Sequence, residues 1–106
     1  MKDEEKRRKL VEFLDQKAFD PVLRRSADSF SGSQREKFED VLESTENEKK
    51  RFHKKYRTAE EVKQNYLSDL SSQTAKKKNA ELEDLSLPRL PQFKDEFLQL
   101  CEELGV

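Results

Sequence analysis

The residues in this sequence that are best suited to binding chemistry are basic. The stretch KKRFHKKYR, Lys49–Arg57, carries six positive charges and no negative one, with Phe52 and Tyr56 set between them. Basic side chains neutralise phosphates and aromatic rings stack on bases, so the pattern is typical of a nucleic-acid contact. It is equally typical of the solvated side of a helix whose rings face the core.

A second basic run, AKKK at residues 75–78, lies in the same part of the chain. Residues 49–78 hold ten Lys or Arg against three acids, an excess that attracts polyanions without sequence specificity. The two runs supply one set of candidate anion or nucleic-acid contacts, called here the basic candidates: Lys50, Arg51, Lys54, Lys55, Arg57, Lys76, Lys77 and Lys78.

The rest of the chain argues against a dedicated nucleic-acid domain. Residues 81–106 carry seven acids and two bases, and the sequence pI is about 5.9. We therefore favour the solvated-helix interpretation and keep nucleic-acid binding as the alternative.

Other residue types form no catalytic or metal-binding pattern. His53 is the only histidine, and no cysteine stands at metal-ligand spacing from it. Cys101 is the only cysteine, so no internal disulfide forms, and Glu102 and Glu103 beside it disfavour a thiolate. With two glycines the chain can hardly build a phosphate-cradling loop. We expect no enzyme activity, no cofactor, no metal and no small-molecule substrate.

Composition indicates an ordered helical chain with a thin core. Hydrophobic residues make up 32% of the 106 residues and charged residues 42%, but the net charge is only −1 and seven Phe and two Tyr are available for burial. Ile is absent, and neither Gly nor Pro occurs between Gly32 and Pro88. No apolar run is long enough for a signal peptide or a membrane helix, so we expect a cytoplasmic location.

The N-terminal third predicts two helices. The first covers about residues 3–17, and its charged start, residues 1–8, is expected to fray. A short second helix follows, with Asp20 as N-cap, Pro21 at the first helical position and Gly32 closing it.

A long central helix over about residues 34–56 is the strongest prediction. Ser33 and Glu36 fit a capping box. Helical spacing then places one stripe of side chains on a buried face, with Lys49 inside it and snorkelling to water: Phe38, Val41, Leu42, Thr45, Phe52 and Tyr56. Acidic residues precede basic ones along this helix, as its macrodipole favours.

Three further helices complete the prediction. Thr58 and Glu61 form a second capping box, which favours a break there over one helix running from 34 to 72. Thr74 caps the next helix. Residues 86–91 form a linker, whose Pro-x-x-Pro spacing we attribute to a proline in the first turn of the last helix rather than to a recognition motif. That helix carries Phe93, Phe97, Leu100, Cys101 and Leu104 on its apolar face and stops at Gly105.

The sequence thus predicts an all-α bundle of five or six helices in a single domain, 1–106, with Phe38, Phe52, Phe97 and Leu100 in the core. We expect a small adaptor or regulatory interaction protein whose partner is another protein or a second copy. Because the central helix is acidic and then basic, two copies laid antiparallel match acid to base. Nucleic-acid binding through the basic candidates is the alternative.

Overall fold

The structure is a computed structural model that describes all 106 residues, and every regular element in it is helical. The α-helical segments are α1 (Asp3–Leu14), α2 (Asp20–Leu23), α3 (Ser33–Lys50), α4 (Ala59–Leu70), α5 (Gln73–Asp84) and α6 (Lys94–Leu104). A π-helical turn, Asp15–Phe19, joins α1 to α2 without a break, and a second π turn, Arg51–Lys55, extends α3. Short 3-10 helices cover Ala27–Ser29 and Leu90–Phe93. The predicted all-α bundle is confirmed, with five continuous helices and a long central one over residues 33–55.

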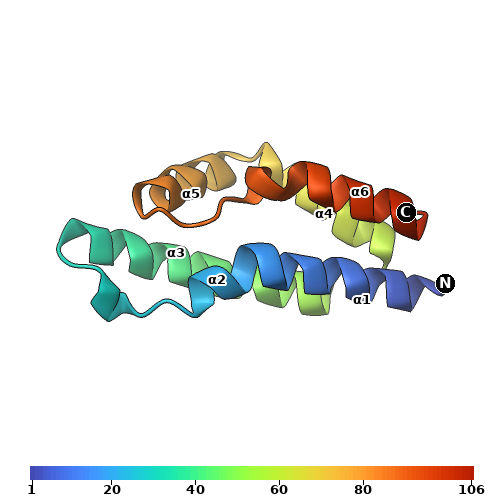
Figure 1. The fold of residues 1–106 in the computed structure, drawn as a ribbon, viewed down its shortest axis with the longest axis horizontal. Coiled ribbons are helices and arrows are strands. Elements are labelled where there is room, and N and C mark those ends of the chain that lie inside the picture. The colour runs from blue at the N-terminus through green and yellow to red at the C-terminus, as the bar shows by residue number, and fades with distance from the viewer.

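The helices form two layers along an elongated molecule of 48 × 21 × 20 Å. In one layer α1 and α2 run along the molecule and α3 returns beside them (Figure 1). In the other layer α4 and α5 follow one another, and α6 returns toward the end where both termini lie (Figure 1). None of the helices is both long enough and apolar enough to cross a bilayer.

Apolar side chains gather in two clusters, one toward each end of the molecule. The larger joins α1, α4 and α6 to the end of α3, and its rings include Phe52, Tyr66 and Phe97. The smaller joins α2, α3 and α5 around Phe38. Three of the four predicted core residues are buried, whereas Leu100 packs only partly buried against the larger cluster.

The predicted break before a second helix is wrong. Asp20 has helical dihedral angles and caps nothing, because the chain passes from α1 into α2 through the π turn. In a regular α-helix the ring of Pro21 would clash with the carbonyl of the residue four positions earlier. The π turn just before Pro21 widens the helix there, so the proline is carried without a break.

Gly32 and Ser33 also differ from their predicted roles. Gly32 does not close a helix but precedes α3, with φ 60° and ψ −133°, a backbone region that favours glycine. The Ser33 side chain makes no capping hydrogen bond, because α3 already begins at Ser33. The capping box predicted for Ser33 and Glu36 is therefore absent.

The second turn of α1 contacts the end of the π turn that extends α3, whereas fraying of residues 1–8 stays a prediction. The helix begins at Asp3, and the guanidinium of Arg7 donates to backbone carbonyls at the end of the π turn that extends α3. The nitrogen–oxygen distances are 2.6 Å to Tyr56, 3.1 Å to Phe52 and 2.5 Å to His53. Arg7 thus satisfies carbonyls that a helix end leaves without partners.

The break between α3 and α4 is confirmed, and a single helix over residues 34–72 is excluded. The Thr58 hydroxyl accepts the backbone N–H of Glu61 at 3.1 Å, as predicted. The Glu61 carboxylate accepts the N–H of Arg57 rather than that of Thr58, so only half of the capping box forms. In α5 the cap is Ser72, which accepts the N–H of Ala75 at 3.1 Å, instead of Thr74.

The last helix matches its prediction closely. Residues 85–89 form a non-helical crossing, but the predicted 86–91 linker already turns into 3-10 helix at Leu90. Gly105 ends α6 with φ 76°. Ser86 ends α5 with φ 57°, the only non-glycine residue of the chain in this left-handed region.

Candidate functional site

The inner face of α3 carries a charged residue among its apolar ones. The side chains buried along this face are Phe38, Val41, Thr45, Glu48 and Phe52, at alternating spacings of three and four residues. Glu48 therefore occupies the position that the sequence analysis gave to Lys49. Lys49 instead lies half-buried beside α2, where its Nζ is 2.8 Å from Oδ1 of Asp20.

Glu48 is paired with a lysine that the sequence analysis placed at the surface. Lys78 Nζ lies 2.9 Å from Glu48 Oε1, and the two side chains are only 7% and 10% exposed. Burial lowers the pKa of Lys78, and the Glu48 carboxylate opposes that change without cancelling it. The pair ties α3 to α5 and removes Lys78 from the basic candidates.

Other polar groups extend this contact into a seam between α3, α4 and α5, defined here as Thr45, Glu48, Arg51, Asp69 and Lys78. Arg51 Nη2 is 3.5 Å from Asp69 Oδ2, and burial raises the pKa of Asp69. Thr45 Oγ1, Glu48 Oε2 and Asp69 Oδ2 are buried and have no hydrogen-bond partner. A buried acceptor without a partner costs about 1–3 kcal/mol, and at Asp69 the ion pair with Arg51 offsets part of that cost.

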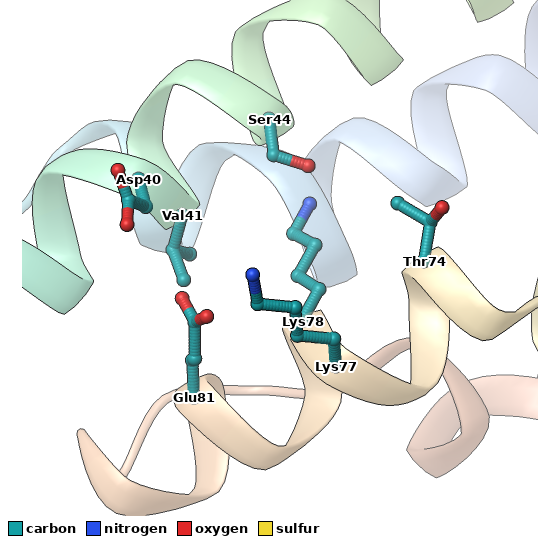
Figure 2. A pocket seen from close by; sticks show the side chains of 7 residues that line it. All are labelled: Asp40, Val41, Ser44, Thr74, Lys77, Lys78 and Glu81. Atoms are coloured by element: carbon teal, nitrogen blue, oxygen red, sulfur yellow. The ribbon is translucent and has the colours of Figure 1, made fainter.

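Two cavities flank the ion pair of the seam. One, of about 310 Å³, lies between α3 and α5; Figure 2 shows Lys78 reaching from α5 toward Ser44 on α3, while Lys77 and Glu81 point into the cavity. The other, of about 330 Å³, lies at the start of α5 and is lined by Glu48, Arg51, Asp69, Ser72, Thr74 and Ala75. Thr74 lines both cavities.

The two π turns of the chain meet in a second polar contact. His53 Nε2 lies 2.8 and 3.0 Å from the two carboxylate oxygens of Asp15, and the rings of Phe19 and Phe52 pack with centroids 5.8 Å apart. Burial raises the pKa of Asp15, against the hydrogen bond from His53. His53 is thus a structural partner of Asp15.

Most of the remaining basic candidates lie exposed, on two sides of α3. Lys50 and Lys54 line a groove of about 380 Å³ between α2 and α3, together with Leu23, Glu46, Lys49 and His53. Lys77 lines the cavity on the α5 side instead. Lys55, Arg57 and Lys76 are exposed as well. Arg51 is engaged with Asp69 and donates to the Tyr56 hydroxyl at 3.3 Å. No cavity is lined by basic candidates of both runs.

The outer face of α3 and its π turn is charged along its whole length. Its exposed side chains at helical spacing, called here the outer stripe, are Glu36, Glu39, Glu43, Glu46, Lys50 and Lys54. Neither Lys50 nor Lys54 has an acidic partner within ion-pair distance. The stripe therefore presents an acidic end and a basic end to solvent.

Of the seam residues only Thr45 was predicted to be buried, because an acid, a lysine and an arginine were all expected to face solvent. Glu48 continues the three-four spacing of the buried face, and that position was the available signal. Nothing in the sequence around Asp69 or Lys78 indicated burial, because their partners, Arg51 and Glu48, lie far away in the chain.

No group of three or more His, Cys, Asp or Glu side chains is placed to hold a metal ion. Comparison of the chain with models of protein families, with curated proteins and with solved structures finds no match.

Proposed function

We propose that this chain is a small cytoplasmic adaptor or regulatory protein that binds protein partners, a second copy among them, through the outer stripe of α3. It is a binding protein without catalytic activity in this proposal. Its one thiol, Cys101, is buried and unpaired, as suits a reducing compartment. The observation that carries the proposal is the separation of acid from base along the exposed face of α3.

The stripe is complementary to itself in one antiparallel register. Glu43 and Lys50 stand equally far from the midpoint between Glu46 and Asn47, and so do Glu39 and Lys54. When two copies pack antiparallel about that midpoint, each of these acids faces the corresponding base of the other copy. Such a contact is two-fold symmetric and closes as a dimer.

The exposed surface indicates how strong this contact is. Met1 is the only large hydrophobic side chain that is exposed, because the Phe and Leu residues of α1 and α2 pack against their own core. Charge complementarity sets register and association rate more than affinity. We therefore expect a weak dimer, with a Kd on the order of 10–100 μM at low salt.

Sedimentation equilibrium over this concentration range tests the proposal. At low salt the average mass should rise with concentration above the 12.6 kDa of one chain. It should fall back toward one chain above about 0.3 M salt, because exposed charges are then screened. A monomer at every concentration and at low salt contradicts self-association through the stripe.

Polyanion binding is the second candidate, and the groove between α2 and α3 supports it. Lys50 and Lys54 line this groove and have no acidic partner. Mixed-sequence DNA or RNA should bind weakly, and binding should be lost near physiological salt as counterion release predicts. The matched variant is Lys50→Gln, Lys54→Gln, Lys55→Gln, which leaves Arg51 to its structural contacts. Tight binding at physiological salt that this variant abolishes would make polyanion binding the main function.

A further inference from the structure

Helix α5 is anchored to the bundle by few apolar side chains. Of its 12 residues only Ala75, Lys78 and Leu82 are buried, and one of these three is charged. Helices α1, α4 and α6 contribute to the larger cluster of 14 buried residues, whereas α5 reaches only the smaller cluster of six. Hydrophobic burial therefore holds α5 less firmly than it holds the other helices.

Unmet hydrogen bonding is concentrated around the same helix. The buried side-chain atoms that have no hydrogen-bond partner are Thr45 Oγ1, Glu48 Oε2, Asp69 Oδ2 and Asn79 Oδ1. Three of them belong to the seam, and the fourth is on α5 itself. Because water can reach these atoms once α5 moves away, the cost of leaving them unpaired falls on the closed state alone.

Two ion pairs join α5 to α3, and neither holds it strongly. Lys78 Nζ lies 2.9 Å from Glu48 Oε1 in the buried pair, whose attraction is largely offset by desolvation. Lys37 Nζ lies 3.0 Å from Asp84 Oδ2 in the other pair, which is exposed to solvent and screened by it.

The chain is not helical on either side of α5. Ser71 and Ser72 separate it from α4, and residues 85–89 form the non-helical crossing that follows it. Backbone rotations in these two segments move α5 as a unit. The helix can therefore leave α3 without breaking any other helix.

The surface beneath α5 is the apolar part of the inner face of α3. Phe38 and Val41 are 0% and 1% exposed there and belong to the same cluster as Leu82. Figure 2 shows Val41 pointing from α3 toward Glu81 on α5. Since Met1 is the only large hydrophobic side chain that is exposed in the closed molecule, displacement of α5 uncovers an apolar surface that the closed molecule lacks.

We propose that α5 is a hinged cover. It leaves the inner face of α3 while α1, α4 and α6 stay packed, and it thereby controls whether Phe38 and Val41 are exposed. The unmet hydrogen bonds of the seam favour this opening. The inference goes beyond the proposed function, because no residue of the outer stripe lies under α5.

Amide hydrogen exchange of the wild type, followed by NMR at a series of low urea concentrations, tests for the cover. Amides from Lys78 to Leu82 should share one protection factor, at least about tenfold lower than those of Leu10, Tyr66 and Cys101. Their exchange should rise with urea, but less steeply than global unfolding does, since opening one helix exposes less surface. Equal protection in all four helices, or exchange in α5 that urea does not change, overturns the proposal.

Two thiols in one molecule make the same comparison at the covered face. Val41→Cys places a thiol under α5, and Cys101, 1% exposed in the larger cluster, is the internal control. Each rate of alkylation by iodoacetamide is divided by the rate of the same thiol in the unfolded chain. The introduced thiol should then react at least about tenfold faster than Cys101. Equal relative rates would mean that α5 leaves only when the whole molecule unfolds, which overturns the proposal.

Thr45→Val tests whether the unmet hydrogen bonds favour opening, because it removes a buried hydroxyl without a partner at nearly constant size. Opening should become at least about fivefold rarer, and alkylation of the thiol introduced by Val41→Cys should slow by the same factor. The exposed control Thr74→Val should leave the rate unchanged. If Val41→Cys does not fold, exchange of the α5 amides reports the same change. No slowing in Thr45→Val, or equal slowing in both variants, overturns this cause of the opening.

Discussion

At the scale of single residues, the α3–α5 seam is the least expected part of this protein. A chain with few apolar residues places Glu48 in the middle of its longest buried face and matches it with Lys78. The cost of desolvating two charges consumes much of their attraction, so such a pair adds little net stability. Its effect is to fix which turn of α5 faces which turn of α3.

A double-mutant cycle measures this cost. Lys78→Met alone leaves Glu48 buried and unpaired and should lower the free energy of unfolding by about 3–5 kcal/mol. Glu48→Leu with Lys78→Met should fall within about 1 kcal/mol of the wild type, because no charge remains buried. The control is Lys37→Met, which breaks an exposed α3–α5 pair of similar length, 3.0 Å, and should cost at most about 1 kcal/mol. If Lys78→Met and Lys37→Met lowered the free energy of unfolding equally in urea, the Glu48–Lys78 pair would be solvated rather than buried.

The same pair makes stability depend on pH in the basic range. Burial lowers the pKa of Lys78 in the folded protein, while in the unfolded chain it stays at the ordinary 10.5. Between these two values the unfolded chain binds more protons, so the free energy of unfolding rises with pH. Relative to the double variant Glu48→Leu/Lys78→Met, the wild type should gain stability in urea unfolding as the pH rises through the basic range toward 10.5. A relative stability that falls over this range contradicts the lowered pKa.

At the scale of elements, hydrophobic spacing predicted where the helices lie but not how they begin and end. The stripe from Phe38 to Tyr56 and the face of α6 follow from side-chain periodicity, and the structure buries most of both. Leu42, Leu100 and Leu104 are only half-buried, and Glu48 takes the place predicted for Lys49. The π turn before Pro21 was missed because proline usually marks the first turn of a helix. The contact of Arg7 with the end of the second π turn was missed as well, since its acceptors lie more than forty residues away in the chain. Partners so distant in the chain leave no local signal.

Arg7 should therefore contribute more to the stability of the protein than its place near the N-terminus suggests. Arg7→Met removes the donor to the carbonyls that end the π turn after α3, and it should cost about 1.5–3 kcal/mol as a charge-assisted contact. Arg8→Met is the matched control, because Arg8 is 63% exposed and makes only a long pair with Glu12. It should cost less than about 0.5 kcal/mol. Thermal or urea unfolding compares the two, and similar losses would contradict a capping role for Arg7.

The end of α5 offers the opposite result, a stabilising change. Ser86 holds φ 57°, where a side chain costs about 1 kcal/mol and glycine costs little. Ser86→Gly should raise the free energy of unfolding by about 0.5–1 kcal/mol. Ser71→Gly, at a residue with φ −103°, should lower it by a similar amount. A loss of stability in Ser86→Gly would show that the Ser86 side chain makes a contact worth more than the strain.

At the scale of the whole molecule, the fold encloses its rings and leaves most of its charge outside, the Glu48–Lys78 pair excepted. Every Phe is at least partly buried, and Met1 is the only large hydrophobic side chain that is exposed. The sequence indicated both the thin core and the order of charges along α3. It did not indicate that the basic candidates divide between two sides of α3, because that depends on where α2 and α5 pack. The outer stripe, with its acidic and basic ends, is the surface through which we propose that this protein recognises a partner.

Charge reversal of the two halves of the stripe is the most direct test of the central claim. One variant carries Lys50→Glu and Lys54→Glu, and the other carries Glu39→Lys and Glu43→Lys. In the antiparallel register each variant places only like charges opposite each other, so neither should self-associate at low salt. An equimolar mixture places an acid opposite a base at each of the four positions 39, 43, 50 and 54 and should sediment as a heterodimer.

The control separates register from net charge. Lys76→Glu with Lys77→Glu changes the net charge by the same amount as the first variant, but at exposed positions outside the stripe. Because its stripe is unchanged, this control should still form homodimers, but with the Glu39→Lys/Glu43→Lys variant it should form much weaker heterodimers than the matched pair does. The proposed function predicts a heterodimer from the matched pair alone in sedimentation equilibrium at low salt. A monomeric matched mixture, or equal association with the control, would contradict recognition through α3.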